Sequence, residues 1–252
     1  MTSDDNPGAG TERSATASHR VGLYSAVLTV VIAVCTFGLA ITAIPNSGAG
    51  CTENCFEYPY VNSLSQFPQD YLWMPPAMLL TVVYVILMVS IHTYSAQHKK
   101  IYSQVALSFA LIAAGILLSI YYIQFFVVPV SLMNEETEGI ALLTQYNPHG
   151  VFIVLEELGY LIMALSFLFV APVFADKGRL ESAVRWVFVA GFVLIIVALT
   201  AILIRYGLDR EDRFEIAAIS VDWLVLIING VLLSIVFRRQ LQKSEPYGQL
   251  RS

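Results

Sequence analysis

Six long apolar runs are the feature that most constrains how this chain can fold. Each run has about 20 residues or more, which is enough for a helix to cross a hydrocarbon core of about 30 Å. Charged residues make up only 13% of the chain, whereas soluble domains carry about 25%. The sequence therefore predicts an all-α membrane protein, a single-domain bundle of six transmembrane helices. The predicted spans cover residues 21–44, 76–95, 101–130, 150–175, 182–204 and 216–237.

The two ends of the chain are polar. Residues 1–20 are rich in Ser, Thr, Ala and Gly, which is typical of a disordered tail. The apolar run that follows is too long for the central region of a signal peptide, so we expect it to be the first span. Residues 238–252 form a basic tail after the last span.

Basic residues predict the orientation. If the N-terminus is inside, 11 of the 14 Lys and Arg residues face the cytoplasm, and only Arg205, Arg210 and Arg213 lie outside. Cytoplasmic loops of membrane proteins carry such an excess of basic residues. We therefore expect a multi-pass protein of the plasma membrane with both termini in the cytoplasm.

The fourth span carries the most unusual chemistry. Asn147 is a good N-cap and Pro148 suits the first helical position, so we expect the helix to start here. This start places the adjacent carboxylates of Glu156 and Glu157 in its outer half. An ionised carboxylate at the bilayer centre costs about 2.5–3.5 kcal/mol on insertion scales. Protonation, a partner or a water-filled cavity must therefore offset the cost of these two.

Polar side chains of the third and sixth spans fall at the same depth. Asp222 and Asn229 are seven residues apart and so share one helix face. We hypothesise that three spans form one outward-facing polar cavity that binds a proton, a cation or a small ligand. Because adjacent helical residues point about 100° apart, we expect only one of the two glutamates to face it. The candidate residues are Tyr121, Tyr122, Gln124, His149, Glu156, Glu157, Tyr160, Asp222 and Asn229.

The same residues also allow a purely structural interpretation. Each carboxylate could be capped by Tyr, Gln or Asn of a neighbouring span, or by Arg205, and could then serve only to fix helix packing. A metal site of His149 with the carboxylates is a weaker interpretation, because the chain lacks compact spacings such as HExxH. No phosphate-binding loop or nucleophile elbow occurs, and we expect no cofactor.

The loop after the first span contains Cys51 and Cys55 on the predicted outer side. Thiols are oxidised there, so we expect a local disulfide. Cys35, within the first span, is interpreted as a small core residue. An interfacial belt is indicated by the aromatic residues near the second span, which are Tyr58, Tyr60, Tyr71 and Trp73.

Three functions fit the sequence. The first is binding or translocation of a proton, cation or small ligand at the carboxylates, with the lipid bilayer as the surrounding partner. The second is an intramembrane enzyme acting on a lipid, with Glu156 or Glu157 as general acid/base and His149 as the only candidate for a second catalytic group. The third is an accessory subunit. The net charge of −5 argues against a nucleic-acid partner, and no feature indicates a homo-oligomer.

Overall fold

The computed structural model describes residues 7–42 and 46–244, with side chains from residue 16 onward. This part of the chain is helical and contains no strand, and six of its helices are long and apolar enough to cross a membrane. The six are α1 (Pro7–Ala40), α2 (Met74–Tyr94), α3 (Lys100–Phe126), α6 (Val151–Val170), α7 (Arg179–Tyr206) and α8 (Arg213–Ser244). The short helices α4 (Val128–Met133) and α5 (Ile140–Leu143) connect α3 to α6.

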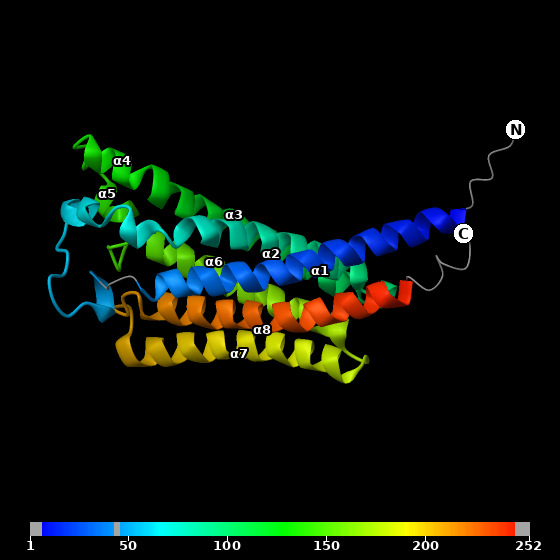
Figure 1. Cartoon of the computed structure of the whole chain (residues 1–252). Helices are drawn as coiled ribbons and strands as arrows, with labels where there is room; N and C mark the ends of the chain where they lie inside the picture. Colours follow the sequence, from blue (N-terminus) through cyan, green and yellow to red (C-terminus); the bar gives the residue numbers. More distant parts are fainter. Residues whose placement is uncertain (1–6, 43–45, 245–252) are drawn as a thin grey trace, which may run out of the picture.

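The two ends of the bundle differ. Helix α1 begins and α8 ends at the same end (Figure 1). The opposite end carries α4, α5, the long connection between α1 and α2, and the connection between α7 and α8. We call it the loop end. The start of α1 and the end of α8 lie on one side of the bundle, because the number of long helices in the described part is even and successive helices run in opposite directions.

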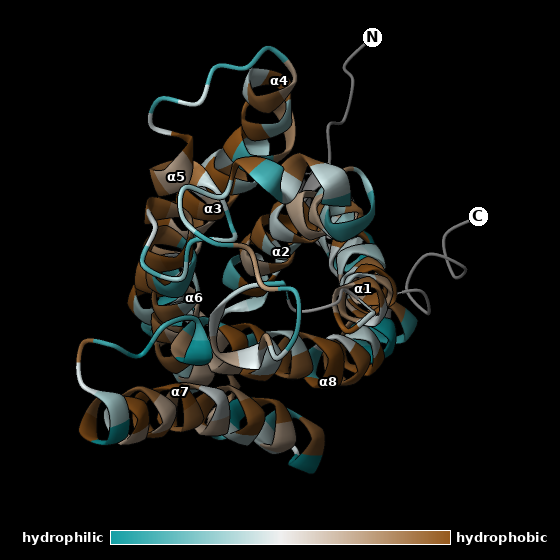
Figure 2. Ribbon diagram, turned by 90° about the vertical axis from the view of Figure 1, so that its left-hand side faces the viewer, coloured by the Kyte–Doolittle hydropathy of each residue, from teal (hydrophilic) through white to brown (hydrophobic). Residues whose placement is uncertain are grey.

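Five of the long helices form a ring. Helix α1 packs against α2 and α8, α2 against α3, α3 against α6, and α6 against α8. Helix α7 lies outside this ring, where it contacts α6 and α8 (Figure 2). Only 17% of the residues in the most apolar 18-residue stretch of α7 are buried, compared with 56% in the corresponding stretch of α6. The interior of the bundle is therefore built mainly by the other five helices.

Several helix bounds differ from those expected. Helix α1 begins at Pro7, so residues 7–20 extend the first span as helix instead of forming a disordered tail; residues 1–6 lie outside the described part. Helix α8 likewise continues into the basic tail, to Ser244. The third span is interrupted at Val127, after which α4 begins with Pro129 in its first turn. Because proline suits a helix start and disrupts a helix interior, the interruption occurs there.

Small residues allow α3 and α6 to approach closely. Ala106, Ala110 and Ala113 follow one another at helical spacing and are all fully buried. On α6, a Cβ added at Gly159 would lie 2.6 Å from Cδ2 of Leu117 on α3. Small residues at helix interfaces are a common device in membranes, where packing replaces the hydrophobic drive between helices.

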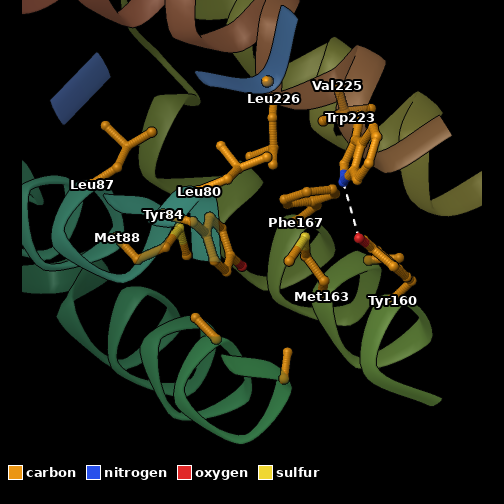
Figure 3. Packing of buried hydrophobic residues seen from close by; sticks show 14 of the residues in the cluster. Leu80, Tyr84, Leu87, Met88, Tyr160, Met163, Phe167, Trp223, Val225 and Leu226 are labelled. Atoms are coloured by element: carbon orange, nitrogen blue, oxygen red, sulfur yellow. Dashed lines mark hydrogen bonds between the residues drawn. The ribbon is translucent and has the colours of Figure 1, made fainter. Parts of the chain in front are cut away.

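The centre of the bundle is aromatic as well as aliphatic. Tyr84 of α2 packs edge-to-face on Phe167 of α6, with ring centroids 6.2 Å apart. Trp223 of α8 lies on the other side of Phe167 and points its indole nitrogen at the hydroxyl of Tyr160 (Figure 3). This core fixes the register between α2, α6 and α8, and so positions the polar groups that lie nearer the loop end.

The connection from α1 to α2 is built of short 3₁₀ turns and contains the disulfide between Cys51 and Cys55. Two of the four residues expected in an interfacial belt do not belong to one. Tyr71 is fully buried and Trp73 is partly buried among other aromatic rings, whereas Tyr58 is exposed. Cys35 is exposed on α1 instead of lying in the core, because it faces away from α2 and α8.

Candidate functional site

Glu156 is fully buried at the start of a hydrogen-bonded chain across the bundle. The hydroxyl of Tyr121 on α3 donates to its Oε1. The Tyr121 hydroxyl also lies 2.9 Å from that of Tyr160, which accepts a 3.0 Å hydrogen bond from Nε1 of Trp223. The hydroxyls of Tyr121 and Tyr160 thus link α3, α6 and α8. Buried polar networks of this kind favour one packing arrangement to the extent that their members are satisfied.

Glu157 has a different partner. The guanidinium of Arg210, in the connection between α7 and α8, donates from both terminal nitrogens to both carboxylate oxygens of Glu157. Only 5% of the Glu157 side chain and 22% of the Arg210 side chain are accessible. A two-pronged pair of this type is strong and geometrically specific. The neighbouring glutamates therefore serve two separate sites, and the cationic partner is Arg210 instead of Arg205.

A cavity of about 180 Å³ lies at the loop end of the bundle. We call it the loop-end cavity. Its walls come from the connections between α1 and α2, between α5 and α6 and between α7 and α8, from the first turn of α8 and from Ile153 of α6. The residues that line it are Asn46, Ser47, Asp70, Trp73, Gln145, Tyr146, Ile153, Asp212, Glu215 and Ile216. Three of these carry a carboxyl group, and none of the described lining residues is basic.

Neutral groups donate hydrogen bonds to the carboxylates of Asp70 and Asp212. Asp70 is buried, and its Oδ2 accepts hydrogen bonds of 3.1 Å from both Asn46 Nδ2 and the Tyr146 hydroxyl. Burial raises the pKa of Tyr146, and the nearby Tyr71 and Asp70 raise it further, so this hydroxyl remains a donor. Asp212 accepts a 2.9 Å hydrogen bond from the backbone N–H of Ala49. None of these partners supplies positive charge.

Gly48 makes the contact with Asp212 sterically allowed. Its φ is +66°, and an added Cβ would lie 2.2 Å from Oδ2 of Asp212. Only glycine combines this backbone conformation with such a close approach. The carboxylate is therefore fixed at the rim of the loop-end cavity by the segment that precedes the disulfide.

Glu215 connects the loop-end cavity to the buried network. It lies in the first turn of α8, is only partly buried, and lines the cavity. Its carboxyl group is close enough to that of Glu156 for the two to interact electrostatically. Oε2 of Glu156 is buried and makes no hydrogen bond to the described residues. Two carboxyl groups this close repel each other when both are ionised.

Asp222 and Asn229 lie deeper in the bundle. Both are buried, and neither side chain makes a hydrogen bond within the described part of the chain. Tyr84 of α2 makes its hydrogen bond to Ser166 of α6. The hydrogen-bonded chain from Glu156 thus ends at Trp223, and the polar groups beyond it are separate.

Three predicted residues lie away from Glu156. Tyr122 is 58% exposed on the outside of α3. Gln124 is buried but bonds to the Tyr71 hydroxyl at 3.3 Å and to the backbone N–H of Gln145 at 3.1 Å. His149 is exposed and pairs with Asp209 at 3.2 Å. His149 precedes the helix, and so does not share a helical face with Glu156.

The expected helix start was three residues too early. Gly150, not Asn147, is the N-cap of α6, and the first helical residue is Val151. Asn147 instead closes a local turn, in which its Oδ1 accepts from the backbone N–H of His149 at 3.0 Å. Its Nδ2 donates to the carbonyl of Ala141. An asparagine side chain can accept a hydrogen bond from a backbone N–H in a turn as readily as at a helix start. Asn147 alone therefore does not locate the start of α6.

Sequence reasoning missed four important residues of this region: Asp70, Arg210, Asp212 and Glu215. One signal could have found Glu215, because it precedes Asp222 by seven residues and Asn229 by fourteen, and so lies on the same face of α8. Because Glu215 is charged, the predicted last span begins only after it, and Glu215 was expected to lie in the preceding loop. The other three residues lie outside the long helices, where helical periodicity does not indicate which way a side chain points.

Comparisons of the chain with known protein families, curated proteins and solved structures find no match. The candidate function therefore rests on the chemistry of the residues described above.

Tyr121→Phe is expected to lower the free energy of unfolding by about 1–2 kcal/mol, because it removes the donor to Glu156 and the contact with Tyr160. Tyr122→Phe is the matched control, since that hydroxyl belongs to an exposed neighbour. Chemical unfolding in mixed lipid–detergent micelles measures both. Equal stability of the two variants would show that the network contributes no net stabilisation.

Proposed function

We propose that this chain is a multi-pass membrane protein that binds a small organic cation in the loop-end cavity. The observation that carries the proposal is the charge of that cavity. Asp70, Asp212 and Glu215 line it, and the described lining residues include no Lys, Arg or His. Glu156 adds a fourth carboxyl group next to Glu215. A positively charged ligand would complete the site electrostatically.

The shape and lining favour an organic cation over a metal ion. Among the described residues, no three His, Cys, Asp or Glu side chains are grouped closely enough to hold a metal. The cavity is also lined by the aromatic side chains of Trp73 and Tyr146. Aromatic rings attract ammonium groups through cation–π interactions of about 0.5–2 kcal/mol. Aromatic rings together with separated carboxylates suit an alkylated amine.

The proposed site is on the outer side of the plasma membrane. The basis is the distribution of Lys and Arg: within the described part of the chain, ten lie on the side where α1 begins and α8 ends, and three lie near the loop end. The disulfide in the same region agrees with an oxidising exterior. On this orientation the termini are cytoplasmic, and the cavity faces the extracellular or periplasmic solution.

The other candidate functions have less support. Translocation needs a polar path to the opposite end, but the hydrogen bonds from Glu156 end at Trp223. A lipid enzyme needs a second catalytic group beside the carboxylates, and the expected one, His149, is exposed and pairs with Asp209. An accessory subunit would leave the uncompensated charge of the cavity without a role. Binding therefore accounts for more of the geometry.

Equilibrium binding of tetramethylammonium to the protein in lipid nanodiscs tests the proposal. We expect saturable binding, with the affinity falling at least about 10-fold in Glu215→Gln, which corresponds to about 1.4 kcal/mol. Glu138→Gln is the matched control, because Glu138 is exposed at the same end and does not line the cavity. The proposal fails if the wild-type protein shows no saturable binding, or if both variants lose affinity equally.

A further inference from the structure

A second cavity adjoins the first, between the loop-end portions of α1 and α8. It has a volume of about 440 Å³, and we call it the apolar cavity. Its lining is largely aromatic and aliphatic, and consists of Phe37, Ala40, Ile41, Trp73, Glu215, Ile216, Ile219, Ser220 and Trp223. Glu215 is the one charged group in this set of described residues.

The two cavities share three residues: Trp73, Glu215 and Ile216. They therefore meet at the Glu215 carboxylate, with the polar walls on one side and the apolar walls on the other. Ile41 and Ile216 are 69% and 50% exposed, so the apolar cavity reaches the outer surface of the bundle. Because both residues adjoin the apolar spans of α1 and α8, this surface borders the lipid.

We propose that the ligand is an amphiphilic amine, which places its ammonium group at Glu215 and its alkyl chain in the apolar cavity. This inference rests on the proposed function, and it specifies the class of cation. Charge complementarity selects the head group, because Glu215 lines both cavities and the buried carboxyl group of Glu156 lies close to it. The apolar lining selects the tail, which reaches the site from the outer leaflet between α1 and α8.

Aromatic contacts preorganise the junction. The rings of Phe37 and Trp223 meet edge-to-face at 5.9 Å, and Trp73 lies 6.3 Å from Trp223 and 5.3 Å from Tyr121. Trp223 is also held by its hydrogen bond to Tyr160. Rigid aromatic walls beside a carboxylate provide a place for the alkylated nitrogen and the first methylenes of a chain.

The test measures binding of alkyltrimethylammonium ions with methyl, butyl and octyl chains to the protein in nanodiscs, after subtraction of partitioning into empty nanodiscs. We expect the affinity to rise about threefold to fourfold for each methylene that enters the apolar cavity. Ala40→Phe, which fills that cavity, should abolish the gain in affinity per methylene. Thermal unfolding of the variant checks that it folds.

Ile219→Ala is the second variant, because it removes apolar surface from the cavity wall without adding a bulky group. It should reduce the gain in affinity per methylene. This result tests the inference even if Ala40→Phe fails to fold. The inference is overturned if tetramethylammonium binds but chain length has no effect, and the proposed function then stands. It is also overturned if the gain persists unchanged in both variants. If none of the ions binds, the inference and the proposed function fail together.

Discussion

Arg210→Gln is expected to lower the free energy of unfolding by about 2–3 kcal/mol. The substitution leaves Glu157, of which only 5% is accessible, without its cationic partner. Breaking a fully buried ion pair costs roughly 3–5 kcal/mol. The expected loss is smaller here because 22% of the Arg210 side chain contacts solvent and because Glu157 can take up a proton. Chemical unfolding in mixed micelles measures the effect.

The control for this prediction is Arg213→Gln. Arg213 pairs with Glu211 through one nitrogen, and about 30% of each side chain is accessible. A pair this exposed contributes about 0–1 kcal/mol. The double variant Arg210→Gln/Glu157→Gln should recover most of the lost stability, because no charge is then buried unpaired. Additive losses in the double variant would contradict a direct pair between these residues.

Gly230→Ala is expected to destabilise the protein by about 2 kcal/mol, because α1 and α8 are in close contact at this position. A Cβ there would lie 2.6 Å from Cγ2 of Val30 and 3.0 Å from the backbone oxygen of Ala26. Val30 is β-branched and cannot easily adopt another rotamer, and the Ala26 oxygen belongs to the helix backbone. The helices must therefore separate, and overpacking of this kind costs about 1–3 kcal/mol.

Gly115→Ala is expected to leave the free energy of unfolding unchanged or to raise it. This glycine also lies within a long helix, but an added Cβ would meet nothing within 4 Å. Alanine is favoured over glycine in a helix interior by up to about 1 kcal/mol. The same unfolding assay should therefore show one variant weakened and the other unchanged or strengthened. A stable Gly230→Ala variant would mean that α1 and α8 pack less closely than described.

The spans could be predicted from sequence because hydropathy and length alone decide them. All six apolar runs correspond to helices long enough to cross a membrane, and the errors were confined to their ends. The helix ends depend on local hydrogen bonds, such as the turn closed by Asn147. Continuation of α1 back to Pro7 was missed because polar residues can prolong a helix beyond the membrane without changing the apolar pattern.

The partners of the carboxylates could be predicted only in part. Tyr160 follows Glu156 by four residues, a spacing that places both on one helical face, and Tyr160 joins Glu156 through Tyr121. The pairing of Glu157 with Arg210 depends on how the connection between α7 and α8 folds back over α6. The positions of Asp70 and Asp212 depend on the long connection between α1 and α2. Such loop contacts have no periodic signal in the sequence.

The most direct test of the outward-facing cation site is thiol labelling of Ile216→Cys in a Cys35→Ala background. Ile216 lines both cavities and is half exposed, so the substitution leaves every carboxylate in place. A membrane-impermeant, positively charged thiol reagent is added to intact cells, with and without tetramethylammonium. Lys243→Cys, at the opposite end, is the control for sidedness.

We predict that Ile216→Cys is labelled from outside, that tetramethylammonium slows the labelling, and that Lys243→Cys reacts only after the cells are opened. Labelling of Lys243→Cys in intact cells, with none at Ile216→Cys, would contradict the orientation. Labelling of Ile216→Cys from outside at a rate that tetramethylammonium does not change would contradict the cation site.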